Sequence, residues 1–225
     1  MSEPRLVIFD MDGTLIDSQN EILASMAWAF DRAGRAQPSR EDVLSIVGLS
    51  LPQAMQALVP DLSPEETEEL AEYYRNSFLA DRASGRHDSG APLYPGAMDA
   101  ITRLHSDPWT LLGVATGKAR RGLDHTFGKH GLAPYFHTLQ TADLHPSKPH
   151  PAMVQQALSD AGCDPARAVM VGDTTYDMEM GRAAGVRTVG VSWGYHPRAR
   201  LEQAAPDVII DDFADLEEVL NGFWS

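Results

Sequence analysis

The architecture of this chain can be inferred from one short stretch near its start, which reads Arg5-Leu6-Val7-Ile8-Phe9-Asp10-Met11-Asp12-Gly13-Thr14. The four consecutive apolar residues at 6–9 predict a strand that is buried on both faces, as the strands of parallel sheets are. If the chain stays extended beyond this strand, the side chains of Asp10 and Asp12 point to the same side. Because neighbouring carboxylates repel each other unless a cation or a shared proton intervenes, the pair indicates a divalent metal and a proton carrier.

Length and composition place the chain among ordinary globular proteins. Its 225 residues are enough for one sizeable core, or for one core and a small second unit, and 43% of them are hydrophobic. The net charge of −14 argues against a protein that binds nucleic acid or an anionic membrane surface. The chain has no apolar run near the ~20 residues of a membrane span, no signal-peptide pattern, and a single cysteine, Cys163. We therefore expect a cytoplasmic protein without an intramolecular disulfide.

The segment from about residue 16 to residue 88 shows a helical spacing of apolar residues and no convincing strand. Ser18 with Glu21 indicates a capping box at the start of its first helix. The polar stretch 81–90 indicates a linker. We predict a small all-helical unit over residues 16–91.

From residue 92 onward, apolar strand-like runs alternate with helical patterns. Such runs are expected at 110–115, 137–139, 168–171, 187–191 and 208–210. The alternation predicts an α/β fold with a doubly wound, parallel, Rossmann-like sheet. Since the strand at 6–9 would belong to this sheet, we predict a core domain of residues 1–15 and 92–225, with the helical unit inserted into it.

Polar residues follow the expected strands, or open the expected helices, at three further places. These are Thr116-Gly117-Lys118, Pro146-Ser147-Lys148-Pro149 and Gly172-Asp173-Thr174-Thr175-Tyr176-Asp177. Together with the motif at residues 10–14, these three motifs resemble those of the haloacid dehalogenase superfamily. The resemblance covers essentially the whole chain. The resemblance is greatest to the subgroup with a helical (C1-type) cap, which contains the phosphoglycolate phosphatases. It implies phosphate ester hydrolysis and identifies residues 16–91 as the cap domain.

Phosphate ester chemistry accounts for the acidic residues of these motifs. A phosphate monoester is a dianion, and it resists an anionic nucleophile until its charge is offset. Mg²⁺ suits this task because it is a hard cation that binds one or two carboxylates and keeps waters and substrate oxygens. Asp10 and Asp173 are the candidates for direct metal ligands. Asp177 is the candidate for a ligand that acts through a bound water or that only contacts the direct ligands. The resemblance adds the backbone carbonyl of Asp12 as a metal ligand.

The resemblance also implies the catalytic roles of the first two aspartates. Asp10 would be the nucleophile, attacking phosphorus to give an aspartyl phosphate. Asp12 would protonate the departing alkoxide and then deprotonate the water that hydrolyses the acyl phosphate. Because a neighbouring carboxylate and partial burial raise the pKa of an aspartate, this acid role is chemically feasible.

The remaining candidates would bind the phosphoryl group. The hydroxyl of Thr116 would bond its oxygens, together with the backbone N–H groups of Gly117 and Lys118 at a helix N-terminus. Lys148 would neutralise charge on the nucleophile and the phosphoryl group.

Plain structural interpretations of the same residues stay open. Thr116 and Ser147 are residue types that cap helices, and Lys118 would suit a solvated first turn. Asp177 would suit a structural position in a helix. The spacing of the histidines indicates no zinc site.

These residues predict a Mg²⁺-dependent phosphatase of a small phosphorylated metabolite, with 2-phosphoglycolate as the first choice. The alternatives are a sugar phosphomutase of the β-phosphoglucomutase type and a non-catalytic phosphate-binding scaffold. Asp12 speaks against the dehalogenases of the superfamily, which lack this residue, and the absence of lysine between Ile16 and Ala91 speaks against phosphonatases, which use a cap lysine. We expect no nucleic-acid or membrane partner, and a monomer or homodimer.

Overall fold

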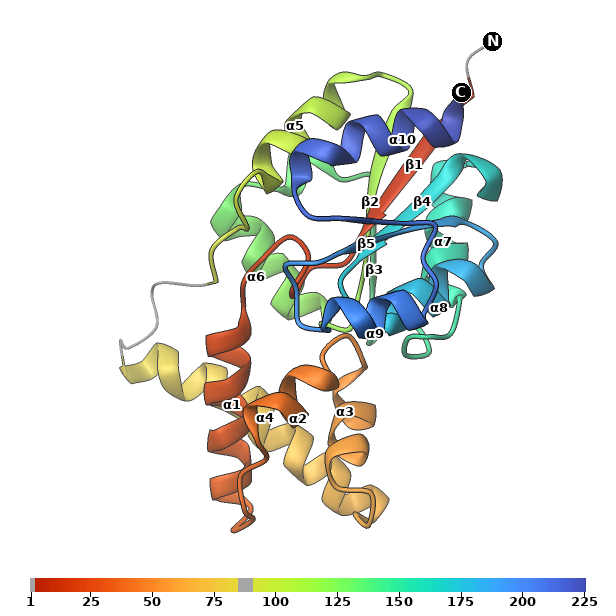
Figure 1. The fold of residues 1–225 in the computed structure, drawn as a ribbon. Helices are drawn as coiled ribbons and strands as arrows, with labels where there is room; N and C mark the ends of the chain where they lie inside the picture. The colour runs from red at the N-terminus through yellow and green to blue at the C-terminus, as the bar shows by residue number, and fades with distance from the viewer. Residues whose placement is uncertain (1–2, 85–90) are drawn as a thin grey trace.

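In the computed structural model, which describes the backbone of residues 3–84 and 91–225 and the side chains of 3–77 and 91–225, six parallel strands form one sheet (Figure 1). The strands are β1 (Arg5–Phe9), β2 (Thr110–Thr116), β3 (Thr138–Thr141), β4 (Ala168–Gly172), β5 (Arg187–Val191) and β6 (Val208–Ile210), in the spatial order β3-β2-β1-β4-β5-β6. The predicted parallel α/β fold is confirmed. Because β2 and β4 flank β1, the carboxyl ends of all three meet where the strand order reverses, which is where open α/β sheets bind ligands.

Both faces of the sheet are covered by helices. These are α5 (Ala97–Ser106), α6 (Arg120–His130), α7 (Ala152–Ala161), α8 (Thr175–Ala183), α9 (Arg198–Gln203) and α10 (Leu216–Trp224), with single 3₁₀ turns at Ala133–Tyr135, Pro165–Arg167 and Phe213–Asp215. Alternate residues of β1 point to opposite faces. Val7 and Phe9 pack with α5, α6 and α10, whereas Leu6 and Ile8 pack with α7 and α8. The short apolar run at 6–9 is therefore at the centre of both apolar layers.

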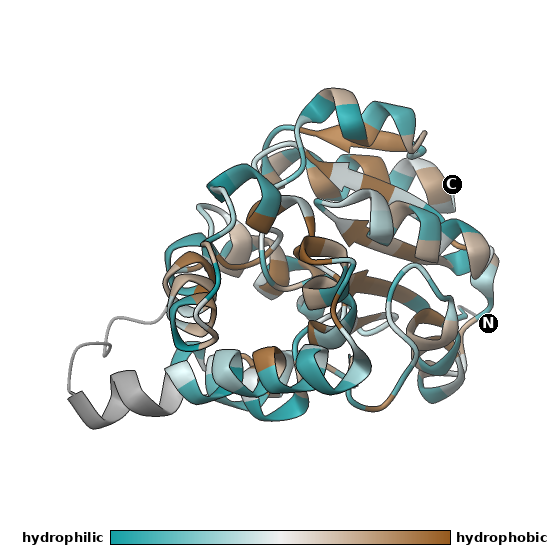
Figure 2. Cartoon of the chain, turned by 90° about the horizontal axis from the view of Figure 1, so that it is seen from below, coloured by the Kyte–Doolittle hydropathy of each residue, from teal (hydrophilic) through white to brown (hydrophobic). Residues whose placement is uncertain are grey.

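Four helices form a second group beyond the carboxyl ends of the strands (Figure 1). They are α1 (Gln19–Arg32), α2 (Arg40–Ser45), α3 (Leu51–Leu58) and α4 (Pro64–Ser84). Their buried side chains, such as Met26, Phe30 and Met55, form a hydrophobic cluster of their own. Figure 2 shows hydrophobic residues concentrated in the strands and on inward helix faces, with hydrophilic residues outside. The separate cluster supports the predicted division into residues 1–15 with 92–225 and residues 16–91, which stays a prediction.

Two local predictions differ from the structure. Ser18 makes no side-chain bond to the start of α1, so the predicted capping box with Glu21 is wrong. The hydroxyl of Ser18 instead donates to Asp12. The predicted linker at 81–90 begins too early, because α4 continues to Ser84. Its remainder, 85–90, lies outside the described residues.

Over the part of the chain that the structure describes, no helix combines the length and the apolar character needed to cross a bilayer.

The separate hydrophobic clusters give a prediction for two methionines. Met55 in α3 and Met170 in β4 are both fully buried, one in each group of elements. Each Met→Ala change should cost about 2–5 kcal/mol because it leaves a cavity. Hydrogen exchange should show that Met55→Ala weakens protection in α1–α4 and that Met170→Ala weakens it in β1 and β4. Equal losses along the whole chain in both variants would contradict two separately stabilised units.

Candidate active site

Three buried aspartates meet at the carboxyl ends of β1 and β4. Asp10 directly follows β1, and its backbone N–H donates to Val171 O over 2.9 Å, which fixes it beside β4. Asp173 directly follows β4, and Asp177 lies in the first turn of α8. One carboxylate oxygen from each aspartate lies within 4.8 Å of the others. Residues separated by more than 160 positions in the chain thus form one acidic cluster.

Lys148 is the counter-charge of this cluster. Its side chain is completely buried, and its Nζ lies 2.8 Å from Asp10 Oδ1 and 2.6 Å from Asp177 Oδ1. Burial disfavours a charged lysine, but the two carboxylates outweigh that effect and raise the pKa of Lys148. Lys148 is therefore a permanent cation, and it contacts two of the three carboxylates.

The excess of negative charge changes the acidity of the aspartates. Burial raises the pKa of Asp10 from 3.8 to about 7, with Asp177 and Asp12 adding to the effect and Lys148 opposing it. Burial and the charges of Asp10 and Asp177 also raise the pKa of Asp173 well above its usual value. A further cation would therefore favour the ionised forms of Asp10 and Asp173.

The donor set fits a divalent metal ion. Apart from the ion pair with Lys148, neither carboxylate oxygen of Asp10 has a hydrogen-bond partner among the described residues, although Asp10 is 1% exposed. A buried carboxylate whose only donor is one ammonium group is costly and indicates a missing partner. Oxygen ligands from carboxylates are those that Mg²⁺ prefers. The two positive charges of such an ion would also neutralise the net negative charge that three ionised carboxylates and one ammonium group leave.

The protein holds Asp173 and Asp177 in different ways. Asp173 Oδ1 accepts a bond from Thr14 Oγ1 over 2.9 Å, and Oδ2 accepts one from Tyr195 N over 2.8 Å. Asp177 forms a capping box with Thr174, whose backbone N–H and hydroxyl both donate to Asp177 Oδ2. Asp177 is therefore a structural helix cap as well as the partner of Lys148.

Two glycines allow the surrounding loops to approach Asp173. Gly13 has φ +90°, and a Cβ placed there would lie 2.3 Å from Asp173 Oδ2. A Cβ at Gly194 would lie 2.1 Å from Asp173 Cβ. Any side chain at either position would displace the carboxylate, so both loops depend on glycine.

Asp12 lies in a second group of polar residues. Its Oδ1 accepts a 2.6 Å hydrogen bond from Ser18 Oγ and lies 3.1 Å from Lys118 Nζ. The side chain of Lys118 is 21% exposed, so the interpretation of Lys118 as a freely solvated residue is wrong. The structure therefore brings together Asp12 and Lys118, from the loops after β1 and β2.

The segment from Ser45 to Ser50 closes over the loops that follow β2 and β3. A Cβ at Gly117 would lie 2.5 Å from Gly48 O, and Ser50 N donates to Ser147 Oγ over 2.7 Å. Ser147 therefore joins the two groups of elements, and its interpretation as a helix cap is wrong. Thr116 is buried, and its hydroxyl accepts from Lys118 N within the loop, with no bond to the start of α6.

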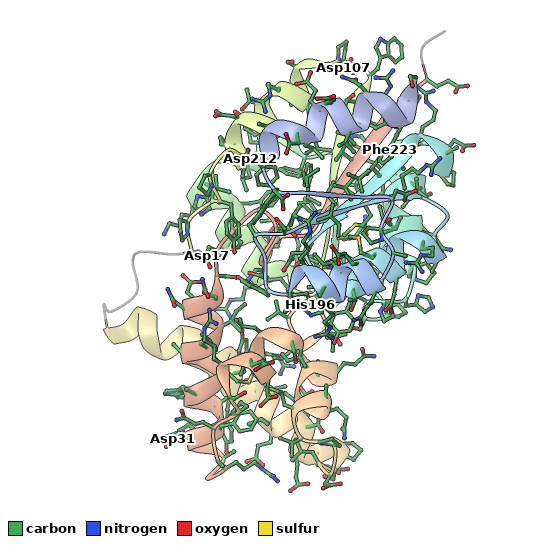
Figure 3. The ribbon with its side chains drawn as sticks, viewed as in Figure 1. Asp17, Asp31, Asp107, His196, Asp212 and Phe223 are labelled. Carbon is green, nitrogen blue, oxygen red and sulfur yellow. The ribbon has the colours of Figure 1, made fainter. Side chains whose placement is uncertain are left out.

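A further link runs through His196, which Figure 3 places at the junction between the sheet and the four-helix group. His196 Nδ1 accepts from Thr175 N, so Nε2 carries the hydrogen and donates to Ser45 O over 3.0 Å. The hydroxyl of Tyr176 donates to the same carbonyl over 3.2 Å. Burial, aided by Arg200, lowers the pKa of His196 to about 4. The histidine is a neutral structural link.

The sequence pattern misses three residues of the site. Thr14 belongs to the first motif but receives no role from it, the spacing predicts a helix cap at Ser18, and nothing assigns a function to Tyr195. All three bond Asp12 or Asp173, directly or through one residue. The signal that could have found Tyr195 is the run Trp193-Gly194-Tyr195, which places a glycine and two polar aromatic residues just after a strand.

The chain is similar to known proteins over most of its length. A family model described as haloacid dehalogenase-like hydrolase matches residues 7–191. The pyrophosphatase PpaX of Bacillus pumilus is 36% identical over 93% of this chain and 93% of that protein. A phosphoglycolate phosphatase of Nitrosococcus oceani is 29% identical over 98% of each. A solved haloacid dehalogenase-like family hydrolase of Streptococcus pneumoniae superposes with a TM-score of 0.81 at 24% identity, covering 97% of this chain and 99% of that one, and this likeness concerns the fold.

The raised pKa values give a prediction for metal-free protein. Because the pKa of Asp10 rises from 3.8 to about 7 on folding, the folded state binds more protons than the unfolded state across this interval. The contribution of Asp10 to the free energy of unfolding is then fully present below pH 3.8, and it is lost as the pH rises through about 7. Melting temperatures of chelator-treated protein should fall from about pH 5 to about pH 8, and Mg²⁺ should raise them more at the higher pH.

Variants separate this effect from the titration of other groups. Asp173→Asn should lose most of the metal-dependent shift, whereas Asp124→Asn, on the exposed side of α6, should keep it. A metal shift of equal size at both pH values, or none at all, would contradict a metal site in the acidic cluster.

Proposed function

Since this chain belongs to the haloacid dehalogenase-like hydrolase family and is a phosphatase of that family, we propose that it hydrolyses a small phosphate ester through an aspartyl phosphate, with Mg²⁺ as cofactor. The observation that carries this proposal is the buried carboxylate of Asp10, whose Oδ1 lies 2.8 Å from Lys148 Nζ and whose Oδ2 has no hydrogen-bond donor among the described residues. The lone pairs of this carboxylate that Lys148 does not engage stay available to a metal and to an electrophile.

The metal would be held by carboxylate oxygens of Asp10 and Asp173, with Asp177 acting directly or through water, and by the backbone carbonyl of Asp12. When bound, Mg²⁺ supplies positive charge that offsets the phosphoryl dianion. Lys148 adds a positive charge that is fixed in place by Asp177. Both effects allow an anionic nucleophile to approach phosphorus.

In the first step, a carboxylate oxygen of Asp10 attacks phosphorus and the ester oxygen departs. The hydroxyl of Thr116 and the backbone N–H groups of Gly117 and Lys118 would bind the phosphoryl oxygens, since they lie at the carboxyl end of β2 before α6. The products are an acyl phosphate on Asp10 and an alkoxide, which needs a proton unless it is a good leaving group.

Asp12 would supply that proton and recover it in the second step. It protonates the leaving oxygen, then takes a proton from the water that attacks the acyl phosphate. That attack releases inorganic phosphate and restores the carboxylate of Asp10. The segment Ser45–Ser50, bonded to Ser147, His196 and Tyr176, would exclude other water during both steps.

We propose 2-phosphoglycolate as the first substrate to test, and inorganic pyrophosphate as the second. The first is supported by the name of a relative at 29% identity, and the second by that of a relative at 36%. In both, the part beyond the transferred phosphoryl group is small and anionic. Gly48 O lies close to Gly117, which restricts the space beside the proposed phosphoryl site. Lys118, which is paired with Asp12, would provide a cation for an anionic leaving group.

The nucleophile is tested by Asp10→Asn, which keeps the shape of the side chain and removes its charge. Turnover of p-nitrophenyl phosphate with saturating Mg²⁺ should fall by on the order of 10³-fold or more, since the covalent step is lost. Circular dichroism should stay unchanged. Asp124→Asn serves as the matched control and should keep full activity. Activity of Asp10→Asn within about tenfold of the wild type would exclude Asp10 as the nucleophile.

The acid is tested by Asp12→Asn with two leaving groups. Hydrolysis of phenyl phosphate, a poor leaving group, should fall by about 10²-fold or more, and that of p-nitrophenyl phosphate by much less, because nitrophenolate departs without a proton. Equal losses on both esters would count against the acid role.

The substrate is tested by ranking kcat/KM for 2-phosphoglycolate, pyrophosphate and a set of sugar phosphates. Conversion of a sugar phosphate to an isomer without release of phosphate would instead support the phosphomutase alternative, and no reaction at all would support a scaffold.

A further inference from the structure

A chain of hydrogen bonds leads from the loop after β5 to the carboxylate of Asp12. The hydroxyl of Tyr195 lies 3.0 Å from Ser18 Oγ and accepts a bond from Ser18 N over 2.9 Å. Ser18 Oγ in turn donates to Asp12 Oδ1 over 2.6 Å. Ser18 is buried, and Tyr195 is half-buried against the hydrophobic cluster of the four-helix group.

The chemistry of the groups sets the direction of this chain. A serine hydroxyl has one hydrogen, and that of Ser18 is given to the carboxylate of Asp12, which can only accept while ionised. The contact between Tyr195 and Ser18 must then be made by the hydrogen of the tyrosine. The bonds therefore run in one direction, from Tyr195 to Ser18 to Asp12, an order in which each bond strengthens the next.

The two oxygens of Asp12 are treated differently. Oδ1 receives the bond from Ser18 and lies 3.1 Å from Lys118 Nζ. The hydrogen bonds that the described side chains give to Asp12 fall on this oxygen. A proton added to Asp12 would have to displace these donors at Oδ1, so Oδ2 is the oxygen on which a proton can be carried.

We propose that Tyr195 is a positioning residue for the general acid: through Ser18 it fixes the rotation of the Asp12 carboxyl so that Oδ2 presents its proton to the leaving group. This inference rests on the proposed acid role of Asp12. It adds two residues, Ser18 and Tyr195, that do not touch the phosphoryl group.

The backbone around Tyr195 makes it a rigid support. Tyr195 N donates to Asp173 Oδ2, and Trp193 Nε1 donates to Thr14 O over 3.1 Å. The same tripeptide thus supports both the acidic cluster and Asp12. Ser18 immediately precedes α1, and its neighbour Asp17 lies where the four-helix group joins the sheet (Figure 3). The acid is therefore oriented by a contact between the two groups of elements.

The test is Tyr195→Phe, which removes the hydroxyl and keeps the ring that packs against the four-helix group. The rates on phenyl phosphate and p-nitrophenyl phosphate are compared for variant and wild type. The loss of kcat on phenyl phosphate should exceed that on p-nitrophenyl phosphate by about fivefold or more, with KM unchanged, because only the poor leaving group needs the oriented proton.

Serine variants and a second tyrosine provide the controls. Ser18→Ala should show the same selective loss. Ser18→Thr, which retains a hydroxyl, should keep the wild-type ratio of the rates on phenyl phosphate and p-nitrophenyl phosphate. Tyr73→Phe, which removes a hydroxyl that donates to Glu69 within α4, should leave the ratio unchanged.

The outcomes separate this inference from the proposed function. If Asp12→Asn discriminates between the two esters and Tyr195→Phe does not, the positioning role is overturned while the acid role stands. If Asp12→Asn itself shows no discrimination, the acid role fails, and the positioning role fails with it. An equal loss on both esters in Tyr195→Phe would indicate a structural role only and would also overturn the inference.

Discussion

The site depends on one electrostatic constraint, the burial of three clustered carboxylates with a single ammonium group beside them. Lys148 contacts Asp10 and Asp177 at ion-pair distance and is itself inaccessible to solvent. Removing one partner from such a group would leave an unpaired buried charge, which is strongly destabilising. The remaining negative charge is an energetic cost that the protein bears in the absence of metal, and it is also what makes the cluster attractive to a divalent cation. The proposed metal site and the proposed nucleophile, Asp10, are both part of this arrangement.

The parallel sheet is the reason these groups can meet. Each strand delivers the residue that follows it to the same edge, so β1 contributes Asp10 and β4 contributes Asp173 without any irregularity in the sheet. Loops must then approach one another closely, and Gly13 and Gly194 make this possible because neither has a Cβ to occupy the space of Asp173. Burial of β1 on both faces gives this edge a rigid foundation.

The four-helix group completes the site through backbone contacts as well as side chains. Ser45 O receives bonds from His196 and Tyr176, and Ser50 N donates to Ser147. These bonds hold a short segment over the loops that follow β2 and β3, and they engage backbone groups of Ser45 and Ser50. Ser18 adds a link on the other side, where the chain leaves the sheet and where the carboxyl of Asp12 is oriented. The bonds that hold Ser45–Ser50 and the bond that holds the Asp12 carboxyl therefore all join the four-helix group to the loops of the sheet.

The sequence by itself determined the parallel α/β fold and indicated Asp10 and Asp173 as site residues, because polar residues that follow buried parallel strands gather at one edge of the sheet. It indicated Lys148 and Asp177 through the motifs that resemble those of the haloacid dehalogenase superfamily. It did not determine the partners of Ser18, Lys118 or Thr14, and it assigned Ser18 to the wrong bond. A hydroxyl at the start of a helix has two possible acceptors, one local and one brought near by folding, and local spacing reports only the first. Periodicity reveals which residues share a face or an edge. The pairing of particular atoms across loops that are far apart in the chain is decided only by the tertiary structure, because it depends on distances of a few ångströms that no repeat in the sequence encodes.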